Sequence, residues 1–210
     1  MAKELLLIFE IIGTVAFALS GAMVGLSKKM DIFGVVTLGI ITSVGGGVIR
    51  DLVLGNTPPA TFQNPVYALV AASVSAVLFF PAVRRILFKK QGIYDKIMLF
   101  MDSLGLGIFT AVGIETALLM GYENPFLLVF VGMITGTGGG IIRDVLAGST
   151  PYIFKKHFYA TASLIGAVFS VILWKNSGSL GAIYFGAAVV FILRIFAAKF
   201  RWSLPKADFE

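Results

Sequence analysis

One seven-residue stretch occurs twice in this chain of 210 residues, and it constrains the fold more than any other feature. Residues 45–51 read GGGVIRD and residues 138–144 read GGGIIRD, 93 positions apart (138 − 45). The same offset continues beyond the motif, where it aligns Pro58 with Pro151. A motif that keeps one register over this length indicates an internal duplication, so we expect the chain to fold as two copies of one unit.

Composition places both copies in a membrane. Hydrophobic residues make up 58% of the chain, the mean hydropathy is +0.93, and only 13% of the residues are charged. Soluble domains carry about 25% charged residues. The net charge of +6 comes largely from short basic clusters between apolar runs, which is the pattern of membrane topology and does not indicate a nucleic-acid partner.

The sequence contains few residues that could form a catalytic site or a metal or cofactor site. It has no cysteine and a single histidine, His157, which excludes disulfides, thiolate ligands and a multi-histidine metal site. No Ser/His/Asp arrangement or HExxH motif is available. We therefore expect no catalytic residue, no metal and no cofactor, and we do not expect an enzyme.

A membrane-spanning helix needs about 20 predominantly apolar residues. The first apolar run lacks the basic start and the cleavage site of a signal peptide, so we expect it to remain as a span. Seven spans are predicted, at about residues 5–26, 32–54, 65–83, 97–119, 125–147, 158–174 and 180–198. The chain then divides into a first three-span repeat, a basic cytoplasmic linker, a second three-span repeat, and a seventh span with a cytoplasmic tail, at residues 1–83, 84–96, 97–174 and 175–210.

The positions of lysine and arginine predict the orientation. With the N-terminus outside, the inner loops and tail hold twelve of these residues and the outer side holds two, Lys3 and Lys175. This asymmetry is the positive-inside pattern of a multi-pass protein of the cell inner (plasma) membrane. Because each copy has three spans, the second copy must insert upside down. The predicted fold class is all-α, with seven transmembrane helices in an inverted repeat of two three-helix units plus one extra helix (3+3+1), as is typical of transport proteins.

The two glycine triplets admit two interpretations. Three consecutive glycines cost about 1 kcal/mol each in a helix, relative to alanine. They are expected to kink the second and fifth spans and to open backbone groups toward a pathway, since lipid cannot satisfy those groups. The alternative is close helix packing, which we expect for the pairs Gly21/Gly25 and Gly132/Gly136. We favour the pathway interpretation for the triplets, which comprise Gly45, Gly46, Gly47, Gly138, Gly139 and Gly140.

Each triplet is followed by an Arg-Asp pair, Arg50-Asp51 or Arg143-Asp144. These charges either frame the two mouths of a pathway, or reach the headgroups and cap helix ends. Neighbouring residues on a helix point about 100° apart, so we expect each arginine to find its partner in the other repeat.

Three acidic residues lie inside predicted spans. Glu10 and Asp102 occupy equivalent positions, 92 residues apart (102 − 10), and Glu115 lies toward the outer end of the fourth span. An acidic group inside a span indicates a functional site. For Glu10 and Asp102, a position near the membrane interface is the alternative, because both lie in the first turns of their spans.

The doubled GGGxxRD motif, one in each three-span half and with a seventh span appended, resembles the prokaryotic branch of the TRIC family, the trimeric intracellular cation channels. Bacterial members also carry a "glycine transporter" domain label. The resemblance covers about residues 5–198. It implies a homotrimer in membrane lipids, with one hourglass pore in each subunit that passes potassium and sodium ions. The Lys-Glu-Val element of animal members is replaced here by Gly46-Gly47-Val48, so the resemblance does not by itself imply their voltage, calcium and phosphoinositide control.

Two other functions remain open at the level of the sequence. Inverted repeats with broken helices also serve alternating-access carriers, so a secondary transporter of a small solute such as glycine or another amino acid is the main alternative. A structural or lipid-handling membrane protein is the third.

Overall fold

The computed structural model describes residues 2–88, 91–155, 158–177 and 181–202. Lys89, Lys90, Lys156, His157 and most of the predicted C-terminal tail lie outside the described residues. The described residues form ten helices and no strand: α1 (Ala2–Ser27), α2 (Ile32–Val53), α3 (Ala60–Gln63), α4 (Val66–Phe79), α5 (Pro81–Phe88), α6 (Gln91–Leu119), α7 (Pro125–Leu146), α8 (Tyr152–Lys155), α9 (Tyr159–Ser177) and α10 (Gly181–Lys199).

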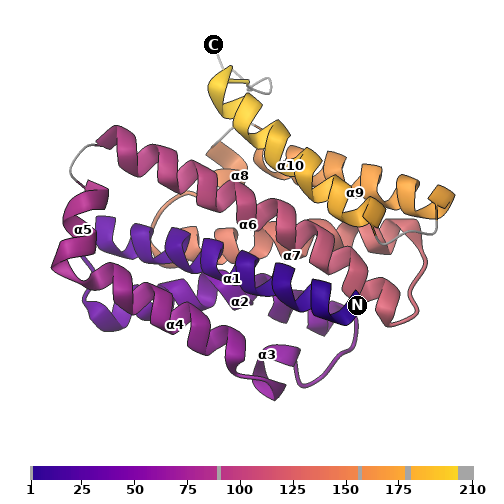
Figure 1. The fold of residues 1–210 in the computed structure, drawn as a ribbon, viewed down its shortest axis with the longest axis horizontal. Coiled ribbons are helices and arrows are strands. Elements are labelled where there is room, and N and C mark those ends of the chain that lie inside the picture. Colours follow the sequence, from indigo (N-terminus) through magenta and orange to yellow (C-terminus); the bar gives the residue numbers. More distant parts are fainter. Residues whose placement is uncertain (1, 89–90, 156–157, 178–180, 203–210) are drawn as a thin grey trace, which may run out of the picture.

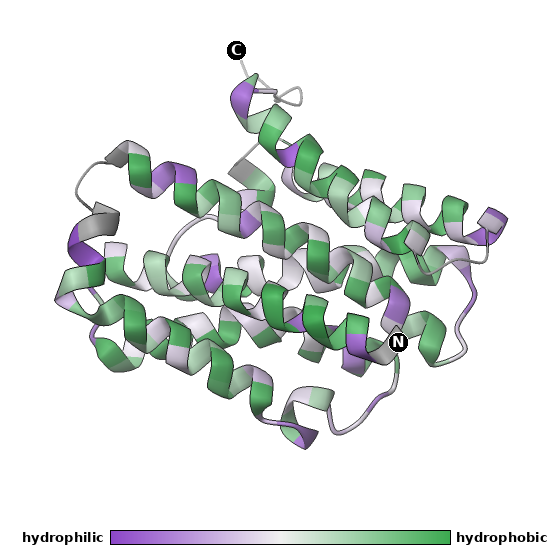
Figure 2. Ribbon diagram, in the orientation of Figure 1, coloured by the Kyte–Doolittle hydropathy of each residue, from purple (hydrophilic) through white to green (hydrophobic). Residues whose placement is uncertain are grey.

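Helix length and composition confirm an all-helical membrane protein. Five helices are long and apolar enough to cross a membrane, namely α1, α2, α6, α7 and α10. Helix α4 is apolar but has only 14 residues, and α9 has 19 residues with the polar end Lys175–Ser177. Hydrophobic residues dominate the helices, while hydrophilic residues gather at helix ends and loops (Figure 2).

The helices of the two halves pack in the same order. In the first half α1 contacts α2, and α4 covers both; in the second half α6 contacts α7, and α9 covers both. The halves meet where α2 packs against α7 and α1 packs against α6. Helix α10 lies against α6 and α9, on the opposite side of the molecule from α4 and α5 (Figure 1).

The predicted kinks at the glycine triplets stay a prediction, but α2 and α7 both remain α-helical through the triplets. The middle glycines explain why. A Cβ atom on Gly46 would overlap the carbonyl oxygen of Thr135, and one on Gly139 would overlap the carbonyl oxygen of Thr42. The two backbones therefore touch at the α2–α7 crossing, and this close packing offsets the low helix propensity of glycine.

The predicted packing of the Gly-xxx-Gly pairs is confirmed. A Cβ atom on Gly21 would lie 2.7 Å from the carbonyl oxygen of Leu38, so α1 and α2 approach closely there. In the second half, a Cβ atom on Gly132 would lie 2.9 Å from the carbonyl oxygen of Thr110 in α6. Small residues thus set the helix spacing within each half as well as between them.

The region between the halves differs from the prediction. The predicted span at residues 65–83 ends early because Pro81 begins a new helix and the preceding residue, Phe80, is extended (φ −59°, ψ 135°). The predicted basic linker at residues 84–96 stays a prediction; its described residues include the end of α5 and the start of α6.

The α2–α7 crossing gives a first prediction. We expect Gly46→Ala to lower the free energy of unfolding by about 1–3 kcal/mol or more, because the added methyl group meets backbone that cannot move aside. Gly47→Ala is the matched control, since the nearest atom to its Cβ would be Arg50 Nη2 at 3.8 Å. Thermal unfolding of both variants in detergent measures the difference, and equal stabilities would contradict the assigned contact.

Candidate functional site

Both arginines of the repeated motif pair with the aspartate that follows them. Arg50 Nε donates to Asp51 Oδ1 at 2.8 Å, and Arg143 Nε donates to Asp144 Oδ1 at 2.8 Å. The expectation that neighbouring residues would not pair is therefore wrong. A long arginine side chain can fold back to an adjacent carboxylate even when the two Cβ atoms diverge.

A second contact fixes each aspartate. Asp51 Oδ2 accepts a hydrogen bond from the backbone N–H of Ala60 at 2.7 Å, and Asp144 Oδ2 accepts one from Tyr152 at 2.8 Å. Each donor lies at the start of a short helix, α3 or α8, whose first N–H groups have no partner within the helix. The aspartates thus tie the ends of α2 and α7 to the segments that follow them.

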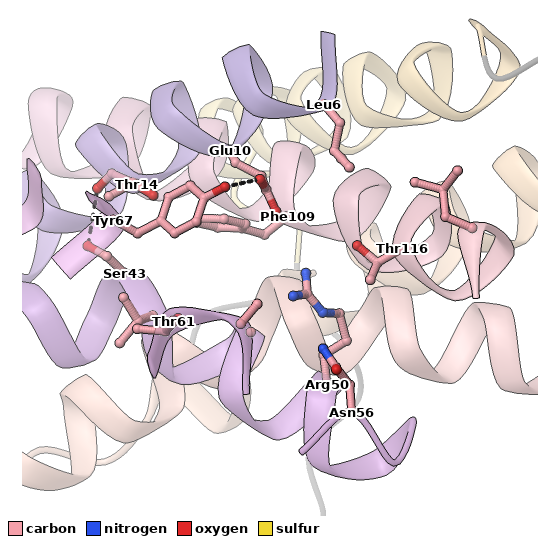
Figure 3. Close-up of a pocket in the computed structure, with 14 residues that line it drawn as sticks. Leu6, Glu10, Thr14, Ser43, Arg50, Asn56, Thr61, Tyr67, Phe109 and Thr116 are labelled. Atoms are coloured by element: carbon pink, nitrogen blue, oxygen red, sulfur yellow. Dashed lines mark hydrogen bonds between the residues drawn. The ribbon is translucent and has the colours of Figure 1, made fainter. Parts of the chain in front are cut away.

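A cavity of about 210 Å³ opens beside Arg50, and we call it the Arg50 cavity (Figure 3). Helices α1, α2, α4 and α6 and the segment around α3 enclose it. Its lining combines two charged residues with hydroxyl, amide and apolar groups: Leu6, Glu10, Thr14, Ser43, Val44, Gly47, Arg50, Asn56, Ala60, Thr61, Tyr67, Phe109, Thr116 and Leu119.

The polar groups of the Arg50 cavity are held in place by neighbouring helices. The Tyr67 hydroxyl on α4 donates to Glu10 Oε2 on α1, and Ser43 Oγ donates to the Thr14 carbonyl oxygen at 3.1 Å. The Arg50 guanidinium points into the cavity (Figure 3). Because Arg50 Nε is bound to Asp51, the charge of this pair balances, and Glu10 adds one further carboxylate to the wall.

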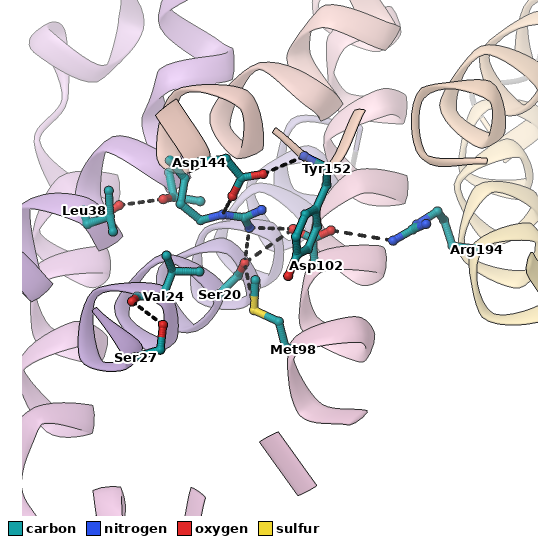
Figure 4. A network of polar contacts seen from close by, with 11 residues as sticks. Ser20, Val24, Ser27, Leu38, Met98, Asp102, Asp144, Tyr152 and Arg194 are labelled. Carbon is teal, nitrogen blue, oxygen red and sulfur yellow. Dashed lines mark hydrogen bonds and ion pairs between the residues drawn. The ribbon is translucent and has the colours of Figure 1, made fainter. Parts of the chain in front are cut away.

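At the other motif, Arg143 is fully buried. Figure 4 shows the network of polar contacts in this region, with Ser20, Asp102 and Asp144 labelled. Arg143 Nη1 donates to Asp102 Oδ1 at 2.6 Å and to Ser20 Oγ. Ser20 Oγ in turn lies 3.4 Å from Asp102 Oδ1, to which it donates. We call this group, with Asp144 and the two residues described next, the Arg143 cluster.

Tyr159 and Arg194 complete the Arg143 cluster from α9 and α10. Arg194 Nη2 lies 4.0 Å from Asp102 Oδ2, and its guanidinium carbon lies 4.7 Å from the centroid of the Tyr159 ring. The Tyr159 hydroxyl also packs on the third glycine of the second triplet, since a Cβ atom on Gly140 would lie 2.8 Å from it. All these side chains are buried, with at most 3% of their surface exposed.

The Arg50 cavity and the Arg143 cluster are built from equivalent positions. Glu10 and Asp102 differ by 92 positions, and so do Tyr67 and Tyr159 (159 − 67). The sequence interpretation missed both tyrosines, although the offset that paired the two acids would have found them. No repeat offset could indicate Arg194, because α10 follows both repeats.

Glu115 is not brought to the Arg50 cavity. Its side chain on α6 is buried, with 1% of its surface exposed, and Oε2 accepts a hydrogen bond from the Tyr184 hydroxyl on α10. It is not among the cavity-lining residues. Within the described residues, no group of three or more His, Cys, Asp or Glu side chains could hold a metal ion.

The described geometry is that of a polytopic helical membrane protein with charged groups buried at two equivalent places. Solved structures identify the class as the fold of the TRIC cation channels. One, reported as the structural basis for conductance through TRIC cation channels, is 39% identical to this chain, with a TM-score of 0.85 over 97% of both chains. The TRIC trimeric intracellular cation channel orthologue from Rhodobacter sphaeroides is 36% identical, with a TM-score of 0.85 over 94% of this chain and 99% of its own.

The family follows from the sequence comparisons. A family model described as "Glycine transporter" matches residues 7–82 and again residues 99–175, which agrees with the duplication. The UPF0126 membrane protein YvgT of Bacillus subtilis is 36% identical over 212 residues, covering 100% of this chain and 98% of its own. The chain therefore belongs to this family, the prokaryotic TRIC family.

The Arg143 cluster generates a prediction about stability. Asp102→Asn removes the carboxylate that Arg143 binds and that Arg194 faces, which leaves Arg143 paired with Asp144 alone and the buried Arg194 without a facing carboxylate. We expect a loss of about 3–5 kcal/mol in the free energy of unfolding. Thermal unfolding of the purified protein measures it. Glu123→Gln, which neutralises an exposed acid in the loop between α6 and α7, is the control and should leave the unfolding midpoint unchanged.

Proposed function

We propose that the protein is a monovalent cation channel for potassium and sodium ions, with one pore in each subunit of a homotrimer. The observation that carries the proposal is the pairing of the Arg50 cavity with the Arg143 cluster, which sit at equivalent positions of two repeats. Two equivalent polar sites within one bundle are what the ends of a single pathway require. The similarity to TRIC cation channels supports the same function.

The proposed architecture is 3+3+1. Helices α1, α2 and α4 form the first repeat, α6, α7 and α9 form the inverted second repeat, and α10 is the extra span. With the N-terminus outside, the Arg50 cavity opens to the outside and the Arg143 cluster lies toward the cytoplasm. Lysine and arginine asymmetry supports this orientation in the inner (plasma) membrane.

The pathway runs beside the α2–α7 crossing, where the backbones leave no room for an ion between them. Gly47 lines the Arg50 cavity and Gly140 faces Tyr159 in the Arg143 cluster. The third glycine of each triplet therefore belongs to the pathway, and the second glycine belongs to the crossing. This division refines the proposal that all six glycines form the pore.

Cation preference follows from the charge of the Arg50 cavity. Two arginines near a pore disfavour cations, but each is paired with its neighbouring aspartate. Glu10 then gives the cavity an excess of negative charge that attracts cations. The hydroxyl groups of Thr14, Ser43 and Tyr67 lie beside it and can replace part of an ion's hydration shell.

A secondary transporter remains the second candidate, and one observation favours it. The Arg50 cavity presents a guanidinium and a carboxylate together, which suits the two charged groups of a small amino acid. The "Glycine transporter" description of the family model agrees with such a substrate. A channel passes current down a gradient, whereas a carrier saturates with its substrate.

Recording from the purified protein in a planar bilayer separates the two. Under a potassium chloride gradient, we expect unitary currents that reverse near the potassium potential, with no change when glycine is added. A silent bilayer, together with saturable glycine uptake into liposomes that contain the same protein, would contradict the channel and support the carrier.

The role of Glu10 is tested by a matched pair of substitutions. Glu10→Gln and Glu115→Gln each replace a carboxylate on a spanning helix that accepts a hydrogen bond from a tyrosine. Only Glu10 lines the Arg50 cavity, so we expect only Glu10→Gln to reduce unitary potassium conductance and the preference for potassium over chloride. Equal effects of both variants would show that Glu115 also acts on the pathway.

The role of the third glycine has its own test. Gly47→Val adds a branched side chain at a residue that lines the Arg50 cavity and whose Cβ atom would lie within 4 Å of no α7 atom. We expect unitary conductance to fall while the protein keeps its thermal stability. Normal conductance in a stable variant would remove Gly47 from the pathway.

A further inference from the structure

Asp102 lies between two arginines and accepts a hydrogen bond from only one of them, Arg143. Its Oδ1 accepts from Arg143 Nη1 at 2.6 Å, while its Oδ2 has no hydrogen-bond partner among the described residues. Arg194 Nη2 lies 4.0 Å from that free oxygen, and Arg194 Nε is likewise without a hydrogen-bond partner in the described part of the chain. Figure 4 shows Arg194 reaching toward Asp102 from α10.

An unmade hydrogen bond between two buried charged groups is costly, because burial has already removed both from water. Arg194 and Asp102 are 3% and 1% exposed, so water does not compensate them well. The Tyr159 ring, 4.7 Å from the Arg194 guanidinium carbon, supports the guanidinium on one face and keeps it near Asp102. Arg194 therefore lies close to Asp102 but does not form a hydrogen bond with it in this structure.

If ions pass through the Arg143 cluster, its buried groups must separate, and the Asp102–Arg143 ion pair at 2.6 Å is the contact that links α6 to α7 there. Opening would strand a buried carboxylate, and removing one partner of a buried ion pair carries a large penalty. A second arginine within reach of the same carboxylate lowers that penalty. Among the described residues that line the Arg50 cavity, Arg50 is the one arginine, and Glu10 is bound by the Tyr67 hydroxyl.

We propose that Arg194 is the second partner of Asp102, receiving its carboxylate when Arg143 moves away and so stabilising the conducting state. Arg194 thus acts as a positioning residue for the gate at the Arg143 cluster. This inference rests on the proposed channel function. It assigns to α10, the helix outside the repeats, a role in opening one end of the pathway.

The test is Arg194→Gln in the full-length protein, recorded in planar bilayers. We expect open probability to fall roughly tenfold or more, which is the effect of losing one hydrogen bond between charged groups, while unitary conductance stays unchanged. Lys199→Gln removes the same charge from an exposed position near the end of α10 and is the matched control. Arg194→Lys keeps the charge without the planar fork, so it should give an intermediate fall.

Two results would overturn the inference. A rise in open probability would show that Arg194 holds the closed state, and an unchanged open probability would show a purely structural role. If Arg194→Gln does not fold, Arg194→Lys is decisive in the same way, because it too must lower open probability.

Cysteine accessibility gives a readout independent of current. The chain has no cysteine, so Ser20→Cys places a single thiol beside Asp102 and Arg143. A thiol reagent should reach it only when the Arg143 cluster opens, and adding Arg194→Gln should slow the modification. If the protein carries no cation current but Arg194→Gln still slows modification, the channel proposal fails and the role of Arg194 stands. If the protein carries normal cation currents but Arg194→Gln leaves the rate of modification unchanged, the channel proposal stands and the role of Arg194 fails.

Discussion

The crossing of α2 and α7 is the contact on which the rest of the structure depends. Gly46 and Gly139 each lie against a backbone carbonyl of the other helix, so no side chain can stand between the helices at that point. In lipid, helix association relies on such close packing, because apolar side chains gain nothing by leaving an apolar solvent. The contact fixes the two repeats against each other. It also places the third glycines beside the crossing, where they face the Arg50 cavity and Tyr159.

Buried charge is the second constraint, and the motif itself meets most of it. An arginine within a membrane protein is costly unless it is paired, and here the next residue supplies the pair. Because the aspartate also caps the following short helix, one carboxylate neutralises the arginine and orders the chain beyond it. This dual use explains why Arg and Asp occur together in both copies.

The sequence was sufficient for the duplication, the membrane class and the family, since each depends on pattern or composition over many residues. The Gly-xxx-Gly contacts were also predictable, because small residues at that spacing have one common use in membranes. The Arg50–Asp51 ion pair was not predictable from the sequence. It depends on the rotamer of the long arginine side chain, and the roughly 100° between neighbouring residues on a helix argued against it. Pro81, which begins α5, is visible in the sequence, but the apolar run continues across it, so the third span was predicted to continue to residue 83. The position of Arg194 depends on how α10 docks, which no internal repeat encodes.

If the two ends of a duplicated protein had the same residues and contacts, both ends would be open or both would be closed. Here the ends differ, because Glu10 is bound by a tyrosine beside a cavity while Asp102 is enclosed by Arg143 and Arg194. The first half has no counterpart of α10, and α10 supplies the arginine that makes the difference. Helix α10 packs mainly on α6 and α9 of the second repeat, and it adds Arg194 to only one of the two similar sites. In the channel proposed above, this difference assigns ion entry to the Arg50 cavity and gating to the Arg143 cluster.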